Sequence, residues 1–219
     1  MYKRQTLEDG RAFYADVKGR LARYGRSPDD LKILPATTFV LGDTDADARE
    51  KAHVVRSHQV SGQTAIKFAE QLWNRDLSDR DPDGPLPAED PVVGENTISK
   101  GRASVRMYRD PVATANEWRA LAEAKKLSLR EVVVEKTSRQ NFIGTPAAVA
   151  AAMDEFVQTD ASDGFVLVPH ITPGGLDYFA DTVVPLLQER GSFRTEYTGT
   201  TLREHLGCAR RPDRSRHTP

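Results

Sequence analysis

The stretch GTPAAVAAAMDEFVQTDASDGFVLVPHITPGGLDYFADTVVPLLQERG, residues 144–191, decides the fold class of this chain. Thr145 can cap a helix and Pro146 suits its first position, and apolar side chains then recur along one face of residues 146–157. Residues 165–169, FVLVP, form a short continuous apolar run, which is typical of a strand buried on both faces in a parallel sheet. A further apolar helix is expected to begin after residues 173–175, PGG, and to run on until Gly191. This succession of helix, strand, loop and helix indicates a helix-rich α/β fold with parallel strands.

Upstream of this stretch, the sequence predicts one more strand among several helices. Residues 31–41 are apolar and β-branched, which predicts a buried strand interrupted at Pro35. The hydrophobic periodicity and the capping residues predict helices over residues 6–24, 46–60, 62–73 and 111–126. Residues 128–134 suit either a helix that begins with a Ser-x-x-Glu capping box or a strand through three consecutive valines, and the pattern leaves both open.

Two segments differ in composition from the rest of the chain. Residues 76–96 are rich in proline and acidic residues, which predicts a long irregular excursion rather than a helix or strand. Residues 210–219, RRPDRSRHTP, are expected to form a flexible basic tail.

The composition excludes several classes of function. The chain of 219 residues carries 31 Lys and Arg against 32 Asp and Glu, a formal net charge of -1, which argues against nucleic-acid binding or membrane attachment through a basic surface. Mean hydropathy is -0.55, and no apolar run approaches the roughly 20 residues of a membrane helix. No apolar stretch follows Lys3 and Arg4 as in a signal peptide, and a single cysteine, Cys208, forms no internal disulfide. These features lead us to expect a cytoplasmic protein.

The polar residues offer two candidate contact residues and no strong catalytic motif. His170 directly follows the strand expected over residues 165–169, and ligands of parallel α/β folds lie at the carboxyl ends of strands. Arg139 lies in a polar loop ahead of the helix at Pro146 and could contact an anionic group. His53 and His58 are five residues apart, whereas a helical metal pair favours a spacing of four, so we expect no metal site. A loop residue without a role is the alternative for both His170 and Arg139.

A series of short motifs in order along nearly the whole chain resembles a known family. In the C-terminal part these are Gly144-Thr145-Pro146, Asp163-Gly164-Phe165, Pro173-Gly174-Gly175-Leu176, Val184-Pro185-Leu186-Leu187 and the run from Phe193 to Gly207; earlier ones are residues 24–35, Gly42-Asp43-Thr44 and residues 76–87. The series resembles the bacterial-luciferase-like flavin-dependent monooxygenases. The branch it is most similar to contains nitrilotriacetate monooxygenase component A, dibenzothiophene-sulfone monooxygenase and long-chain alkane monooxygenase.

The resemblance implies a fold and a domain division. Members of the family are (β/α)8 barrels about twice as long as this chain, so residues 1–209 would be the C-terminal part of an incomplete barrel. Residues 31–41 and 165–169 would be its seventh and eighth strands, with an insertion at about residues 74–137 between them. The phosphate-binding loop of the family would lie before Met1. Val166, His170 and the pair Ser138-Arg139 depart from the family pattern on the side where a ligand is expected.

The resemblance also implies a chemistry. The family uses reduced FMN from a separate flavin reductase to insert one oxygen atom of O2 into a small organic substrate, and His170 and Arg139 would contact substrate or flavin. Because two barrel strands alone leave unpaired edges, we expect the chain to be marginal by itself and to act in a homo-oligomer or with a complementary N-terminal half. Two alternatives remain open: a non-catalytic remnant or interaction module, and a deazaflavin-dependent oxidoreductase of the same superfamily.

Overall fold

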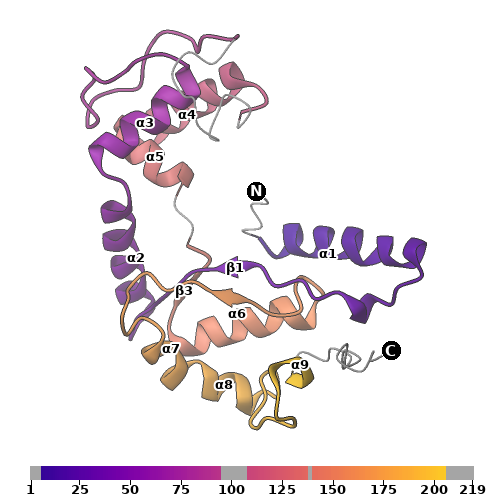
Figure 1. Ribbon diagram of the computed structural model, residues 1–219. Helices are drawn as coiled ribbons and strands as arrows, with labels where there is room; N and C mark the ends of the chain where they lie inside the picture. The colour runs from indigo at the N-terminus through magenta and orange to yellow at the C-terminus, as the bar shows by residue number, and fades with distance from the viewer. Residues whose placement is uncertain (1–5, 95–107, 138–139, 206–219) are drawn as a thin grey trace, which may run out of the picture. The chain divides into compact units, whose positions relative to one another are not determined.

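The computed structural model describes residues 6–94, 108–137 and 140–205, and it divides the chain into two compact units (Figure 1). Unit 1 consists of Met1–Pro35, Pro146–Gly164 and Ile171–Pro219. Unit 2 consists of Ala36–Thr145 and Phe165–His170. The tail at residues 210–219 lies outside the described residues, so its expected flexibility stays a prediction.

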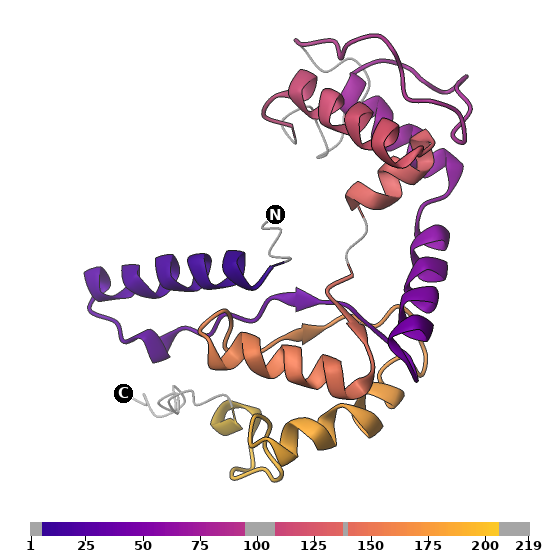
Figure 2. The same ribbon diagram turned by 180° about the vertical axis from the view of Figure 1, so that it is seen from behind.

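Unit 1 is helical in its described part. Its helices are α1 (Leu7–Leu21), α6 (Pro146–Gln158), α7 (Asp177–Thr182), α8 (Val184–Glu189) and α9 (Leu202–His205), with short 3-10 turns at Ala22–Tyr24 and Pro28–Asp30. The predicted helix at residues 6–24 is confirmed: Thr6 caps α1 by accepting a hydrogen bond from the Asp9 N–H, and Gly25 ends the segment at a φ of 63°. Helix α6 packs on α8, which Figure 2 shows from behind.

The long helix predicted before Gly191 is wrong as a single element. It is broken at Val183 into α7 and α8, with Pro185 in the first turn of the second helix. Proline has no N–H to donate to the preceding turn, and its ring clashes with the carbonyl four residues back, so the α7 hydrogen-bond ladder cannot continue through it.

Unit 2 combines four short strands with four helices in its described part. The strands are β1 (Ala36–Thr37), β2 (Phe39–Leu41), β3 (Phe142–Gly144) and β4 (Val166–Leu167), and the helices are α2 (Asp45–Gln59), α3 (Gly62–Trp73), α4 (Pro111–Lys125) and α5 (Leu129–Thr137). The segment left open at residues 128–134 is a helix, because Ser128 and Glu131 cap each other's backbone N–H groups at 2.8 and 3.3 Å. The strand predicted from Leu31 begins only after Pro35, at Ala36.

The core of unit 2 lies among α3, α4 and α5. Trp73 and Trp118 meet edge to face with their ring centroids 6.1 Å apart, among buried leucines and valines. Residues 76–94 are irregular, as predicted, and wrap over this core. The Trp73 indole donates to the Glu89 carbonyl at 2.8 Å, and the Arg119 guanidinium donates to the Pro87, Ala88 and Glu89 carbonyls. These hydrogen bonds satisfy backbone acceptors that an irregular segment would otherwise leave without partners.

The strands pair in parallel, as the sequence predicted. Residues 36–37 pair with β4 and residues 39–41 pair with β3. The Thr37 carbonyl accepts from Val168 N and the Thr38 carbonyl accepts from Phe142 N. Successive carbonyls of an extended chain point to opposite sides, so β3 and β4 flank the same strand on opposite edges. β3 was not predicted, and it separates β2 and β4 along the sequence.

The expectation that residues 165–169 are buried on both faces is wrong. Val166 is 50% exposed and Val168 is 43% exposed, so one face of β4 is open. A continuous apolar run is buried on both sides only where other helices or strands pack against both faces of its strand.

Candidate functional site

His170 lies where the sequence places it, directly after β4 in unit 2. Its Nδ1 is 3.2 Å from the amide nitrogen of Gln59, which is the last residue of α2. Its Nε2 is buried and has no hydrogen-bond partner among the described residues. Burial lowers the pKa of the His170 imidazole, since the charged form loses solvation there.

The Gln59 amide selects the tautomer of His170. In the orientation seen here its nitrogen donates, so Nδ1 of His170 accepts and the proton of the neutral ring sits on Nε2. The free Nε2–H is a donor without an acceptor, which is a costly arrangement in a buried place. His170 can therefore donate a hydrogen bond to an oxygen acceptor of a ligand.

Arg139, the second predicted contact residue, lies outside the described residues together with Ser138. The chain is anchored immediately after it. The Gln140 amide donates to the Ala52 carbonyl of α2 at 2.9 Å, and the Asn141 side chain accepts from Thr38 N at 3.3 Å. The role of Arg139 stays a prediction.

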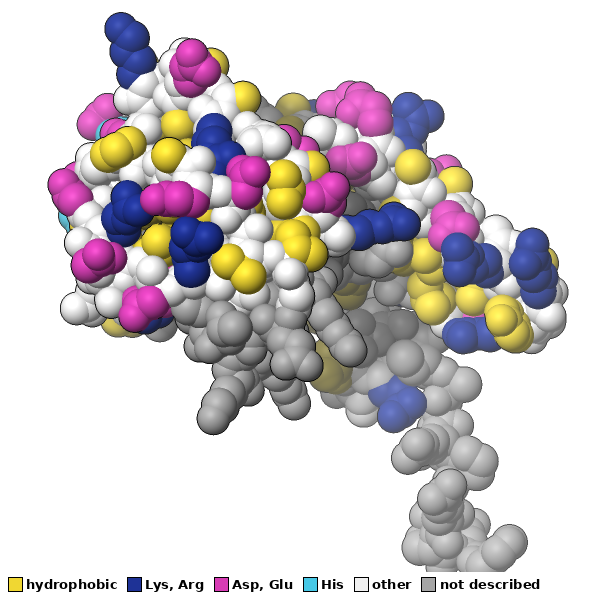
Figure 3. Space-filling view, turned by 90° about the horizontal axis from the view of Figure 1, so that it is seen from above, with side chains coloured by type: hydrophobic (Ala, Val, Ile, Leu, Met, Phe, Trp, Pro, Cys, Tyr) yellow, Lys and Arg dark blue, Asp and Glu magenta, His cyan; other side chains and the backbone are white. Residues whose placement is uncertain are grey.

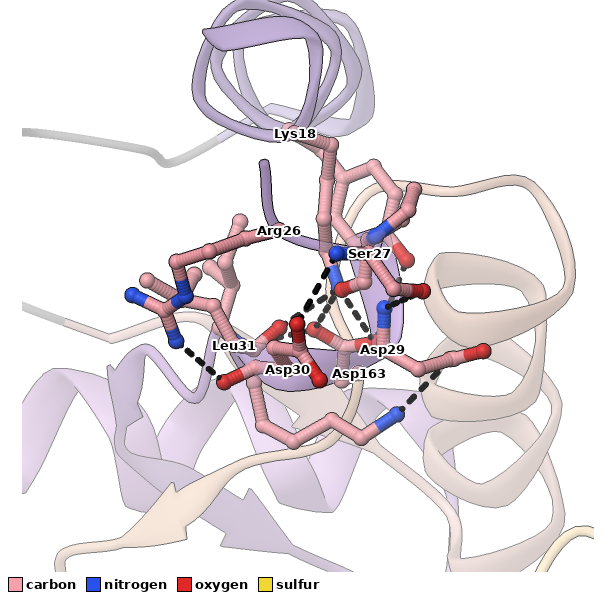
Figure 4. Close-up of polar contacts among 11 residues, drawn as sticks. Lys18, Arg26, Ser27, Asp29, Asp30, Leu31 and Asp163 are labelled. Atoms are coloured by element: carbon pink, nitrogen blue, oxygen red, sulfur yellow. Dashed lines mark hydrogen bonds and ion pairs between the residues drawn. The ribbon is translucent and has the colours of Figure 1, made fainter. Parts of the chain in front are cut away.

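A second polar cluster, which the sequence did not predict, lies in unit 1 around Lys18 and Asp163 (Figure 4). The buried Lys18 ammonium donates to the Pro28 and Leu31 carbonyls at 2.8 and 2.7 Å and forms an ion pair with Asp163 at 3.1 Å. The Asp163 carboxylate also accepts from the Ile33 N–H at 2.6 Å and from the Tyr14 hydroxyl at 3.1 Å.

The charges of this cluster are mutually stabilised. Burial opposes the charged form of Asp163, but the Ile33 N–H, Lys18 and Tyr14 outweigh it and lower the pKa of the carboxyl. Burial likewise opposes charge on Lys18, and the hydrogen bond and charge of Asp163 outweigh it, so the pKa of Lys18 is raised. All three N–H donors of the Lys18 ammonium are used inside the chain, on Pro28, Leu31 and Asp163. The ammonium therefore ties the segment that precedes β1 to helix α1, and its role is structural rather than ligand binding. The sequence does contain a signal for this cluster: Lys18 lies within the apolar face of α1, three residues before Leu21.

Other kinds of site find no support in the part of the chain that the structure describes. It contains no group of three or more His, Cys, Asp or Glu side chains that could hold a metal ion. None of its helices is long and apolar enough to cross a membrane. On the face seen in Figure 3, acidic and basic side chains are interspersed with hydrophobic ones, in keeping with the near-zero net charge.

Comparisons with known proteins give one consistent result. The profile of the luciferase-like monooxygenase family matches residues 3–163. Nitrilotriacetate monooxygenase component A from Aminobacter aminovorans is 37% identical over 209 residues, which are 94% of this chain and 43% of that protein. N-acetyl-S-(2-succino)cysteine monooxygenase from Bacillus subtilis (strain 168) is 34% identical over 204 residues, which are 92% of this chain and 43% of that protein.

Solved structures agree with the sequence comparison. EDTA monooxygenase from Chelativorans sp. BNC1 aligns with a TM-score of 0.56 and 27% identity, over 94% of this chain and 45% of that one. A riboflavin lyase whose structure holds modified FMN and riboflavin aligns with a TM-score of 0.55 and 26% identity, over 92% of this chain and 40% of that one. The chain therefore spans less than half the length of the proteins it matches.

Proposed function

The chain belongs to the luciferase-like monooxygenase family, and from this premise we propose that it is part of a two-component, FMN-dependent monooxygenase. In the proposed reaction, one oxygen atom of O2 enters a small organic substrate and the other leaves as water, and reduced FMN from a separate flavin reductase would supply the two electrons. The observation that carries the proposal is the match over nearly the whole chain to relatives that are named monooxygenases. Those names favour oxygen insertion over a deazaflavin-dependent reaction or a non-catalytic module.

We place the chain in the C-terminal part of the barrel, with about residues 74–137 as an insertion. Parallel strand pairing in unit 2 supports a βα origin for its sheet, and the α4–α5 helices pack with α3 into a core of their own. The matched fraction of 43% supports a second segment that completes the protein, which we propose to be a complementary N-terminal half.

The described residues do not by themselves make a flavin site. An FMN needs several donors for its phosphate and a flat apolar slot for its ring. His170 supplies one unpartnered N–H, and the buried Lys18 ammonium is fully engaged within unit 1. Most flavin contacts must then come from residues that the described part lacks, and we derive no chemical step from this chain alone.

Within the assembled protein we propose that His170 contacts substrate or flavin. Its neutral Nε2–H suits an oxygen acceptor, such as a substrate carboxylate or a ring carbonyl. Arg139 remains the proposed contact for an anionic group.

The test is an FMN titration of the chain alone and of a fusion that adds the part of nitrilotriacetate monooxygenase component A that this chain does not match. Flavin fluorescence reports binding, and loss of nitrilotriacetate in the presence of a flavin reductase, compared with the reductase and FMN alone, reports turnover. We expect no saturable binding by the chain alone and micromolar binding with turnover by the fusion. A fusion that folds yet neither binds FMN nor consumes nitrilotriacetate argues for the non-catalytic remnant.

A further inference from the structure

The orientation of His170 depends on the last turn of α2. Gln59, the final residue of that helix, donates to Nδ1 of His170 across 3.2 Å, and both residues belong to unit 2. The Gln59 side chain is exposed, so water competes for this hydrogen bond and the bond contributes little by itself. Its geometry is therefore set by how firmly the backbone around Gln59 is held.

The end of α2 lacks the backbone cap that many helices have. Val60, which follows Gln59, is extended at a φ of -122° rather than left-handed, and Ser61 already caps the start of α3. The last carbonyls of a helix have no partner within the helix. This turn therefore needs hydrogen-bond donors from another element.

Arg130 of α5 supplies those donors. Its Nε donates to the Val60 carbonyl at 2.9 Å, and its Nη2 donates to the Ser57 carbonyl at 2.8 Å. The two carbonyls lie on either side of Gln59 along the chain. The guanidinium also places a positive charge at the negative end of the α2 dipole, which stabilises the turn further.

Arg130 is itself held by the rest of unit 2. Its backbone N–H donates to the Pro82 carbonyl of the irregular segment at 2.8 Å. Leu129, the residue before it, is fully buried in the core of α3, α4 and α5. A continuous set of contacts thus runs from this core through Arg130 and the last turn of α2 to Gln59 and His170.

We propose that Arg130 is a positioning residue: it holds the last turn of α2 in place, so that Gln59 keeps His170 as an Nε2–H donor for the ligand. The inference rests on the proposed function, in which His170 contacts substrate or flavin. It assigns a task to α5, which lies in the proposed insertion. Such a site favours a ligand with an oxygen acceptor at His170 over one that presents a donor.

The test begins with a carboxylate at position 59. In Gln59→Glu the carboxylate can only accept, so the proton of the neutral ring should move from Nε2 to Nδ1. Long-range nitrogen–proton NMR correlation of the full chain distinguishes the two tautomers at a pH where the ring is neutral. The signals of His170 are identified as those missing from His170→Ala. A proton that stays on Nε2 in Gln59→Glu would overturn the proposal.

The second step asks whether this tautomer shift needs Arg130. When Arg130→Ala is combined with Gln59→Glu, the shift toward Nδ1–H should fall by roughly half or more, because the carboxylate is no longer held against the ring. If Arg130→Ala does not fold, Arg130→Lys replaces it. Lysine keeps the charge but loses the planar two-point contact, so a loss in the same direction is expected.

The matched control is Arg119→Ala. Arg119 lies in the same unit, but its guanidinium donates to carbonyls of residues 87–89 rather than to α2. Combined with Gln59→Glu, it should leave the tautomer shift unchanged. A shift that is equally large with and without Arg130 would overturn the proposal. An equal loss in the Arg119 variant would also overturn it, because the effect would then be a general loosening of unit 2.

Turnover of the fusion separates the failure of this proposal from that of the proposed function. In the fusion, Arg130→Ala and Gln59→Glu should each lower nitrilotriacetate turnover about tenfold, since a misplaced donor is ineffective. A tautomer shift that depends on Arg130, in a fusion without FMN binding or turnover, would support the positioning of His170 and reject the monooxygenase. An active fusion that neither substitution slows would reject the role of Arg130 and leave the monooxygenase standing.

Discussion

Lys18 and Asp163 show what a buried charge demands of its surroundings at the scale of single residues. Each charged atom has partners within 3.2 Å, and those partners come from α1, from residues 28–33 and from the segment that follows α6. Removing one member leaves the other charge buried without its counter-ion, which is usually more costly than the net benefit of the pair.

We therefore expect Lys18→Ala to lower the free energy of unfolding by about 3 kcal/mol in urea denaturation. The control is Arg20→Ala on the same helix, whose ion pair with Asp16 is exposed and should be worth less than about 1 kcal/mol. Equal losses for the two variants would mean that the Lys18 cluster contributes no more than a surface pair.

The same cluster should give the stability a defined pH dependence. The pKa of Asp163 is lowered in the folded state, so its contribution is present above the unfolded pKa and disappears as the pH falls through the folded value. The pKa of Lys18 is raised, so its contribution is complete below the unfolded pKa and disappears as the pH rises through the folded value. The difference in unfolding free energy between wild type and Asp163→Asn should be largest near neutral pH and shrink toward strong acid. A difference that stays constant from neutral pH to pH 2 would contradict the assignment.

His170 lends itself to two measurements. In the proposed fusion, replacing it with alanine should lower turnover by more than tenfold, since the substitution removes an oriented donor. In the chain alone, NMR titration should show the imidazole titrating below its usual range, because burial lowers its pKa. Unchanged turnover would make His170 a loop residue without a role.

At the scale of elements, the local sequence predicted most helices correctly. It did not predict the features that depend on contacts between residues far apart in the sequence. The caps at Thr6, Thr44 and Ser61 are local signals, and the helices they begin were predicted. β3 has only three residues and is held by β2 from about 100 positions earlier, which no local pattern records. Asp163 belongs to the motif Asp163-Gly164-Phe165, but its partner Lys18 lies 145 residues away. The position of His170 after a strand could be predicted because the rule for it is local.

Gly42 tests the junction between β2 and α2. A Cβ there would lie 2.4 Å from the backbone nitrogen of Ala48, so the helix start and the strand end approach too closely for a side chain. We expect Gly42→Ala to destabilise the chain by about 2 kcal/mol, because backbone atoms must shift. Gly19→Ala on the exposed side of α1 meets nothing within 4 Å and should stabilise by about 1 kcal/mol. Thermal unfolding of the two variants shows whether each substitution raises or lowers the stability. No change in stability for Gly42→Ala would contradict the close approach of Gly42 to the Ala48 backbone.

At the scale of the whole molecule, the exposed valines of β4 should affect how the chain behaves in solution, since Val166 is 50% exposed and Val168 is 43% exposed. Exposed apolar side chains that lie next to one another bind hydrophobic dyes. They also contribute little to the free energy of unfolding, because folding has not removed them from water. The chain alone should therefore bind anilinonaphthalene sulfonate, and Val166→Thr combined with Val168→Thr should reduce the fluorescence more than Val93→Thr does. The fusion should bind less dye and melt at a higher temperature, since a segment that binds only the folded state stabilises it. Dye binding that is equal in the chain, the double variant and the fusion would mean that the exposed apolar surface lies elsewhere in the molecule.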